Sequence, residues 1–460
     1  MARVGAILIF LLLTSIQSMA QEEGMVSFKP SMQRAEENTS YLKETLLEDW
    51  PLSWKYIPLG QNSFFSLGGD ARSLYEYFRH RDFREVDEDQ NGWLFQRFLF
   101  HADVRLGNFR TFVQLQSLHH WFSREPSSPV DRDDFDIHQF FAEYQLALGQ
   151  NTMTARLGRQ ELSLGSQRLF SFREGPNARL AFNAIKTDLH WTNYQLSLFY
   201  AEPISNQPGS FDNQVFDSES TWGAYWVGPA PFGLPFQMDG YYIGMSSTRR
   251  IYEQGVANET RHSIGTRLWG ESGAFSYNNE FIYQFGSWGD ADISAYTLSF
   301  DLGYQLSELG WKPKLGLKTE IVSGDQSTTD NDLNTFNALY PRGAYFGLIA
   351  LIGPANLIDF HPSFSLSPSE RFSFTVDWDI FWRHTTTDGV YGPNAQLFRE
   401  GSGSDQSYLG HQPGFEMAFE ASNWWELSLE GSWFFTSDFW RDTGEHDNVL
   451  HFAVVSSWKF

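Results

Sequence analysis

The last residues of the chain, Leu450 to Phe460, read LHFAVVSSWKF and decide the fold. Alternate residues of a β-strand point to opposite faces, so a period of two separates this segment into two sets. One set is Phe460, Trp458, Ser456, Val454, Phe452 and Leu450. The other is Lys459, Ser457, Val455, Ala453 and His451. The pattern predicts a strand with one face suited to hydrocarbon and one suited to water.

The same alternation recurs in residues 65–77, 98–106, 296–305, 372–383 and 415–433. In the fourth of these, aromatic and aliphatic residues stand opposite Asp377, Asp379 and Arg383. A soluble β-sandwich also alternates, but its apolar face is buried, which gives no reason for aromatic faces opposite charge in every hairpin. A transmembrane barrel turns the apolar face to lipid and the polar face to water. The sequence therefore predicts an all-β protein, a transmembrane antiparallel β-barrel.

Composition excludes several other classes of protein. Of 460 residues, 17% are aromatic and only 19% are charged, against roughly 25% charged in soluble domains. Such a chain has enough apolar surface to fold. The formal net charge of −23 repels nucleic acid, and the absence of cysteine excludes disulfides and thiol chemistry. No apolar stretch beyond the N-terminus approaches the ~20 residues of a membrane-spanning helix.

The N-terminus has the features of a secretory signal peptide. Arg3 precedes an apolar run from Val4 to Leu13, and Ser18-Met19-Ala20 offers small residues before a cleavage at Gln21. A first transmembrane helix is the alternative, which the polar residues after Ala20 disfavour. We therefore expect a signal peptide in residues 1–20, an N-terminal arm in residues 21–60 and one barrel in residues 61–460.

Chain length sets the expected strand number. At about 22 residues per strand and connection the barrel has about 18 strands, with 16 and 20 as alternatives. Short turns at 107–108, 149–151 and 367–369 are predicted to be periplasmic. Polar stretches at 80–92, 121–138, 202–222, 323–343 and 385–410 are predicted to be outer loops. The final strand, ending at Phe460, resembles the signal read by barrel-assembly machinery. We expect the Gram-negative outer membrane as location, with its lipid and lipopolysaccharide as partners.

Signals for chemistry are weak, and we expect neither an enzyme nor a cofactor nor a metal site. G-x-S-x-G, H-E-x-x-H, GxGxxG and P-loop motifs are all absent. His361-Pro362-Ser363 is similar to the His-x-Ser pair of outer-membrane phospholipases, but Phe364-Ser365 replaces the expected Asn-Gly. Acidic stretches at 87–89, 131–136 and 325–332 lack the glycine and glutamate of a calcium-binding loop and are predicted to be solvated loops.

The most specific segment is Leu157-Gly158-Arg159-Gln160-Glu161-Leu162. Related stretches follow at 165–169, 177–182, 339–347, 356–362 and 381–391, with Leu67-Gly68-Gly69-Asp70-Ala71-Arg72 near the start. In this order, over nearly the whole mature chain, they resemble the alginate export family of outer-membrane barrels. The resemblance implies a monomeric 18-stranded barrel whose arginine-rich lumen conducts an anionic polyuronate outward. It also implies roles for Arg72, Arg159 and, less directly, Arg179.

Guanidinium groups suit this task, because they stay charged and donate in pairs to carboxylates. The predicted lumen residues are Arg72, Arg159, Arg179, Arg97, Arg105, Arg156 and Arg383. The alternative is that such arginines only pair with inward acids as struts of the wall. For any single arginine the two interpretations have equal weight, and the resemblance favours function for Arg72 and Arg159.

The alternation of side chains along each predicted strand, here called strand parity, predicts a lumen that carries both positive and negative charges. The eleven inward bases are Arg72, Arg97, Arg105, Arg110, Arg156, Arg261, Arg267, Lys314, Lys318, Arg383 and Lys459. The fourteen inward acids are Asp70, Glu76, Asp103, Glu143, Glu280, Asp301, Glu320, Asp359, Asp377, Asp379, Glu416, Glu420, Glu426 and Glu430. Bases lean toward the first half of the chain and acids toward the last quarter, which predicts a field across the pore.

The functional hypothesis is therefore a passive outer-membrane channel for anionic or polar poly- and oligosaccharides. One alternative is a general diffusion porin with weak selectivity for small solutes. Another is a barrel hydrolase using His361, Ser363 and Asp359, and a third is a receptor or adhesin with a plugged lumen and no conductance. Reversal potentials and a test of hydrolysis by the His361→Ala variant discriminate among them.

Overall fold

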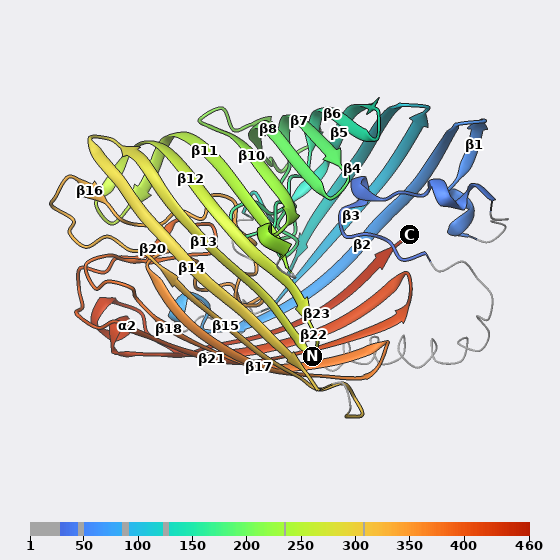
Figure 1. The fold of residues 1–460 in the computed structure, drawn as a ribbon. Helices are drawn as coiled ribbons and strands as arrows, with labels where there is room; N and C mark the ends of the chain where they lie inside the picture. The colour runs from blue at the N-terminus through green and yellow to red at the C-terminus, as the bar shows by residue number, and fades with distance from the viewer. Residues whose placement is uncertain (1–27, 45–49, 85–91, 123–127, 234–235, 307–308) are drawn as a thin grey trace.

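A computed structural model describes residues 28–44, 50–84, 92–122, 128–233, 236–306 and 309–460. Within these residues the chain forms a closed antiparallel barrel of 18 strands, which confirms the predicted fold and strand number (Figure 1). The barrel closes where the last strand pairs with the first long one, with Ala71 opposite Trp458 and Tyr75 opposite Val454. The predicted signal peptide and the acidic residues 87–89 lie outside the described residues.

The barrel wall consists of long strands, each paired with its neighbour in sequence. They are β2 (Ser63–Arg79), β3 (Gly92–Leu106), β4 (Phe109–Trp121), β5 (Asp133–Leu148), β6 (Asn151–Gln160), β7 (Phe182–Trp191), β8 (Tyr194–Ser205), β10 (Glu219–Pro229), β11 (Gln237–Tyr252), β12 (Gly255–Ser272), β13 (Phe275–Trp288), β14 (Ala291–Gln305), β15 (Lys314–Val322), β17 (Leu357–Ser369), β18 (Phe372–Trp382), β21 (Tyr408–Ser422), β22 (Trp425–Thr436) and β23 (Val449–Lys459).

Shorter strands and helical turns lie at the two ends of the barrel. Short strands are β1 (Ile57–Gly60), β9 (Gln214–Val215), β16 (Asp332–Leu333), β19 (Val390–Tyr391) and β20 (Leu397–Arg399). Helical turns are η2 (Arg34–Glu36), η3 (Ser40–Glu44), η4 (Leu52–Trp54), η5 (Arg81–Phe83) and η7 (Pro231–Gly233), and α2 (Asp438–Thr443) is one short α-helix. Among the described residues, no helix is long and apolar enough to cross a membrane.

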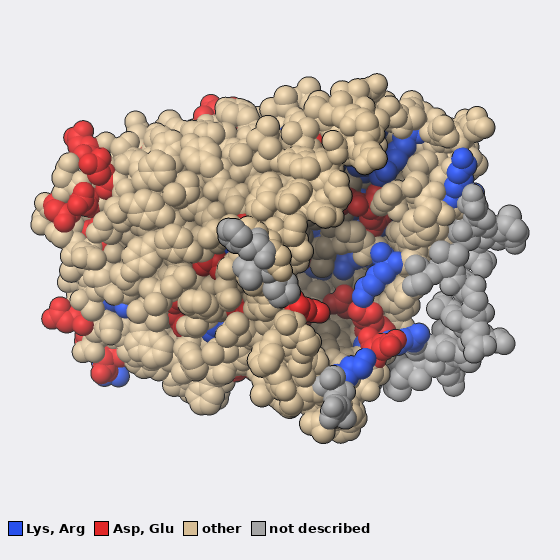
Figure 2. Space-filling view, viewed as in Figure 1, with Lys and Arg blue, Asp and Glu red and all other residues tan. Residues whose placement is uncertain are grey.

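The wall has the two faces that the alternation predicts. Outward side chains stay exposed, with Trp378 at 50% and Phe98 at 45%, while inward Arg97 and Asp379 are fully buried. Figure 2 shows charged side chains mainly at the two ends, separated by a broad belt of other residues. This belt is the surface that a barrel turns to hydrocarbon.

The long connections gather at one end, as predicted, although the turns at 253–254 and 289–290 at that end are also short. The turns at 107–108 and 149–150 lie at the end where β2 begins and β23 ends, so this is the periplasmic end. One predicted turn is displaced. Residues 367–369 belong to β17, and a register shift between Leu366 and Ser369 accommodates Pro368, so the turn falls at 370–371. Strand β5 also begins earlier than expected, at Asp133.

Two long outer connections fold back into the lumen, which the sequence did not predict. We call residues 161–181 and 323–356 the inner segments. They pair with each other, since the Tyr340 N–H donates to the Leu169 carbonyl at 2.9 Å and the Ser171 N–H to the Tyr340 carbonyl at 3.0 Å. Phe170 and Leu339 are buried in the apolar cluster between these segments and the wall. The lumen is therefore filled in its middle by loop residues.

The described residues of the N-terminal arm are 28–44 and 50–60, and residues 28–44 lie inside the periplasmic mouth. Phe28 stacks on Trp424 with ring centroids 5.6 Å apart. Ala35 is buried together with Phe112 and Phe141 of the wall. These apolar contacts fix the arm against the barrel on both sides of the mouth.

Candidate functional site

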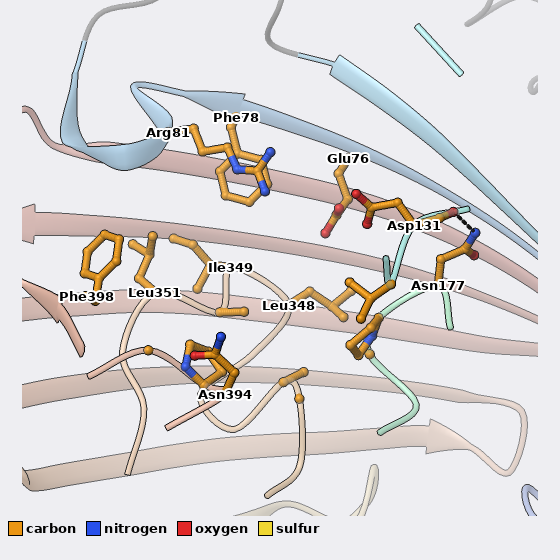
Figure 3. Close-up of a pocket in the computed structure, with 18 of the residues that line it drawn as sticks. Glu76, Phe78, Arg81, Asp131, Asn177, Leu348, Ile349, Leu351, Asn394 and Phe398 are labelled. Atoms are coloured by element: carbon orange, nitrogen blue, oxygen red, sulfur yellow. Dashed lines mark hydrogen bonds between the residues drawn. The ribbon is translucent and has the colours of Figure 1, made fainter. Parts of the chain in front are cut away.

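The inner segments separate two cavities of the lumen. The outer cavity has a volume of about 500 Å³ and the inner one about 710 Å³. Both are lined by Gly175, Ala344 and Leu348, which we call the constriction. Figure 3 shows the outer cavity, with Glu76 and Asp131 directed toward each other across from Leu348. These three residues separate the inner cavity from the outer one.

Close packing sets the shape of the constriction. A Cβ added to Gly175 would lie 3.1 Å from the Ala344 Cβ, and one added to Gly343 would lie 2.7 Å from the Pro176 Cδ. These distances are at or below ordinary van der Waals contact, so a larger residue would push the two inner segments apart. Glycine at positions 175 and 343 therefore lets the two inner segments approach each other this closely.

A carboxylate surrounded by arginines anchors the first inner segment next to the constriction. Glu174 forms an ion pair with Arg97, a second with Arg179 at 2.5 Å and a longer one with Arg72 at 3.7 Å. Asp70 lies 3.7 Å from both Arg97 and Arg179. Burial opposes ionisation of Glu174, but Arg179 and the other arginines hold its pKa well below the usual range. The cluster keeps Glu174 ionised and its segment in place.

Arg72 also fixes the backbone of the constriction directly. Its guanidinium donates to the carbonyls of Glu174, Gly175 and Pro176, the last two at 3.0 and 2.9 Å. Arg72 is buried and lines the inner cavity. The observed contacts of this predicted lumen residue thus hold an inner segment.

Four other predicted lumen arginines lie at two locations in the barrel. Arg97 and Arg179 join Arg72 around Glu174. Arg105 and Arg156 lie at the periplasmic mouth and donate to the arm. Their assignment to a conduit remains a prediction.

Two of the predicted lumen arginines, Arg159 and Arg383, lie away from both Glu174 and the arm. Arg159 stands opposite Phe140, whose ring is exposed on the outer face of the wall, and donates to the Ile137 carbonyl at 2.8 Å. Arg383 is buried at the outer end of the barrel, where it donates to backbone carbonyls that include those of Gln406 and Ser404. Their assignment to the conduit likewise remains a prediction, and their contacts stabilise the strand end and an outer loop.

The inner cavity presents opposite charges on different walls. Its lining charges that have no ion-pair partner in the described part of the chain are Lys318, Arg342 and Lys459 among the bases and Glu416, Glu426 and Glu430 among the acids. Lys318 and Arg342 are exposed to the cavity. The acids share β21 and β22, where Glu416 lies opposite Glu430. Figure 2 shows charges of both signs in the mouth that leads here.

Sequence reasoning missed two parts of this site, Glu174 and the arm. Glu174 lies in the stretch Arg173-Glu174-Gly175-Pro176, whose Gly-Pro pair is the available signal of a specific turn. Nothing in the local pattern connects Glu174 to Arg97, which lies 77 residues away. Arg342 belongs to a quoted family-like stretch, but strand parity cannot place a residue outside a strand.

His361 sits between two carboxylates on the wall of the inner cavity. Its Nδ1 lies 2.6 Å from Asp379 and its Nε2 3.6 Å from Asp377. Both ring nitrogens face oxygen acceptors, which suits a protonated imidazole. The three residues also bring ligand atoms within 4.8 Å of one another, an arrangement that a metal ion can use. Among the described residues, the contacts of the His361 ring are with Asp377 and Asp379 rather than with Ser363.

Lys55 is a buried cation of the N-terminal arm, and we expect it to make docking of the arm depend on pH. Its buried Nζ lies 4.0 Å from Glu37 and over the ring of Phe28. Burial, followed by repulsion from Arg34, lowers the pKa of Lys55 to about 7. If the arm were released, the Lys55 amine would regain its usual pKa. Between about pH 7 and 10 the released state therefore binds more protons than the docked state. Docking should strengthen as pH rises through this range.

We expect a spin label at Ser40→Cys, on an exposed position of the arm in a chain without cysteine, to become more mobile as pH falls from about 10 to about 7. The substitution Lys55→Met should remove this pH dependence and reduce the mobile fraction at pH 7. Electron paramagnetic resonance spectra provide the measurement. An equal pH dependence with Lys55→Met would show that another group is responsible.

Comparison with known proteins gives a family and a fold. The sequence matches a family model described as alginate export over residues 64–455. No curated protein matches it significantly.

Solved structures share the barrel at low identity. OccK8 (OprE) of Pseudomonas aeruginosa is 10% identical with a TM-score of 0.58, covering 88% of this chain and 99% of that one. OccD3 (OpdP) of the same organism is 11% identical with a TM-score of 0.58, at 88% and 92% coverage. A BenF-like porin from Pseudomonas fluorescens Pf-5 is 11% identical with a TM-score of 0.57, at 86% and 98% coverage.

Proposed function

The chain belongs to the alginate export family and lies in the Gram-negative outer membrane, and from this premise we propose that it is a passive channel for anionic or polar poly- and oligosaccharides. The solute crosses the charged lumen through the inner cavity, the constriction and the outer cavity. Neither a cofactor nor a covalent step is part of this proposal. The family supports the class of solute, and the geometry of the lumen supports the route.

The inner cavity carries the proposal. Lys318 and Arg342 are exposed there and form no ion pair with an acid in the described part of the chain, unlike the arginines around Glu174. They can therefore attract a carboxylate, while the opposing acids on β21 and β22 repel it and accept hydrogen bonds from sugar hydroxyl groups. An acidic sugar has both a carboxylate for these bases and hydroxyl groups for these acids.

Two other functions are weighed against this one. A general diffusion porin is favoured by the balance of free bases and acids in the inner cavity, because balanced charge selects weakly. A hydrolase is disfavoured by the contacts of His361, which are with Asp377 and Asp379. If His361→Ala abolished a hydrolytic activity of the purified protein while conductance persisted, the hydrolase would replace the channel as the proposal.

Flux into proteoliposomes tests the proposed function. We expect a short oligouronate to enter vesicles containing the protein faster than a neutral oligosaccharide of equal length. Vesicles without protein provide the background. Equal rates for the two sugars would leave a general porin, and no flux of either would exclude a channel for sugars.

The assembly and processing of the protein are part of the same proposal. Residues 1–20 would be removed as a signal peptide, leaving the arm before a barrel in residues 61–460. Barrel-assembly machinery would recognise the last strand, which ends at Phe460, and the product would be a monomer. In the folded protein the Phe460 carbonyl accepts hydrogen bonds from Arg34 and the Gly69 N–H, so recognition would precede docking of the arm.

A further inference from the structure

The arm spans the periplasmic mouth and is matched in charge to the two walls it contacts. Lys29 Nζ lies 2.6 Å from Glu420 on β21, next to the acids of the last quarter of the chain. Farther along, η2 lies against the basic wall formed by β3, β4 and β6. The arm is thus held by a cation at the acidic wall and by acceptors at the basic wall.

At the basic wall, consecutive arm residues each accept a hydrogen bond from a different arginine. Arg110 donates to the Ala35 carbonyl, Arg156 to the Glu36 carboxylate and Arg105 to the Glu37 carbonyl, each at 2.7 Å. We call these arginines the arginine row. Without the arm, one N–H of each arginine loses this acceptor and is open to water or to another acceptor in the lumen.

The arginine row has one positive charge that wall acids do not neutralise. Arg110 pairs with Asp103 at 2.8 Å and Arg156 pairs with Glu143 at 2.7 Å, whereas Arg105 shares Asp103 at 3.2 Å. Three cations therefore meet two wall carboxylates, and Glu36 of the arm supplies the third negative charge.

The contact of Glu36 is open to competition. Its side chain is 51% exposed, and it lines both the inner cavity and a neighbouring cavity of about 190 Å³ that also contains Lys186. Partial burial opposes ionisation, but Arg156 lowers the pKa of Glu36 to about 2, so the carboxylate stays charged. A solute carboxylate that enters the inner cavity meets Glu36 first, and it reaches the Arg156 guanidinium, whose side chain is 7% exposed, when Glu36 moves aside.

We propose that the arginine row is a binding site for an acidic oligosaccharide, and that the arm is the internal occupant which the sugar displaces. A uronate chain offers a carboxylate flanked by hydroxyl and ring oxygens, the same sequence of acceptors that residues 35–37 present. The inference rests on the proposed function, since it assigns the entry site of that solute. It also gives the arm a role, to close the basic wall until a sugar competes for it.

The test uses the full-length protein with Ala35→Cys, because the native chain has no cysteine and position 35 is 3% exposed between wall aromatics. We expect slow reaction with a maleimide, about tenfold faster reaction with saturating oligouronate, and no change with a neutral oligosaccharide of equal length. Adding Glu36→Gln should give a similar acceleration without sugar, the change expected for losing one hydrogen bond between charged groups.

A matched control is Ala338→Cys, on an inner segment and 1% exposed, whose labelling rate should respond to neither sugar nor Glu36→Gln. Retention of the compact band on unheated gels shows that each variant is folded. Unchanged labelling of position 35 by oligouronate overturns the proposal, whether or not Glu36→Gln accelerates it. Acceleration by oligouronate together with no oligouronate flux supports the binding site and refutes the proposed function.

Discussion

The substitution Glu174→Gln is expected to open the constriction and weaken the inner segment. It removes the carboxylate shared by Arg72, Arg97 and Arg179. Arg97 and Arg179 keep Asp70 and Glu161 as partners, at 3.6 to 3.7 Å. Removing one partner of a buried ion pair costs about 3–5 kcal/mol, and because the Glu174 side chain is 28% exposed we expect a loss nearer the lower value. Residues 174–176 should detach from the wall, so single-channel conductance should rise and resistance to thermal unfolding should fall.

Glu271→Gln is the matched control, since Glu271 is exposed at the periplasmic end of β12 and has no ion pair among the described residues. It should change neither conductance nor thermal unfolding. Planar-bilayer recordings and differential scanning calorimetry provide the measurements. If Glu174→Gln behaved like this control, the arginines around Glu174 would not be what holds the constriction.

The double substitution Lys318→Gln with Arg342→Gln is expected to make the channel prefer cations. It removes two exposed positive charges from the inner cavity, while Glu416, Glu426 and Glu430 remain. The reversal potential in a KCl gradient should shift toward the potassium equilibrium potential by tens of millivolts. The affinity of polyuronate for the pore, measured as block of the current, should fall by about tenfold or more per lost charged contact. Screening by salt reduces this effect.

The control for charge alone is Arg132→Gln with Arg441→Gln. These arginines are 50% and 66% exposed in outer pairs with Asp134 and Asp438, so the net charge changes equally outside the lumen. At about 0.1 M salt, charges more than about 10 Å from the path are largely screened. An equal shift of the reversal potential in both double variants would contradict selection by the inner cavity.

The barrel could be predicted from the sequence because each strand carries its own evidence. In residues 372–382 the period of two alone separates exposed Trp378 from buried Asp379. The arrangement of the long loops at one end followed from chain length and turn residues. The exact turn near Pro368 could not be predicted, because a register shift depends on the neighbouring strand.

The candidate site was less predictable, since its contacts join residues far apart in the chain. Strand parity placed Arg72, Arg97 and Arg156 in the lumen, but it cannot show which acceptors they meet. Those acceptors lie on segments without periodicity, at Glu174 and at Glu36. An arginine on a predicted strand therefore has a known direction, whereas its role depends on how irregular segments fold back.

The most direct test of the proposed channel is the reversal potential of wild-type single channels in a KCl gradient, with and without added polyuronate. We predict that polyuronate blocks the current and that the potential shows either anion preference or weak selectivity, as expected for balanced free charges in the inner cavity. Strong cation preference with no block by polyuronate would contradict the assignment and leave a general porin.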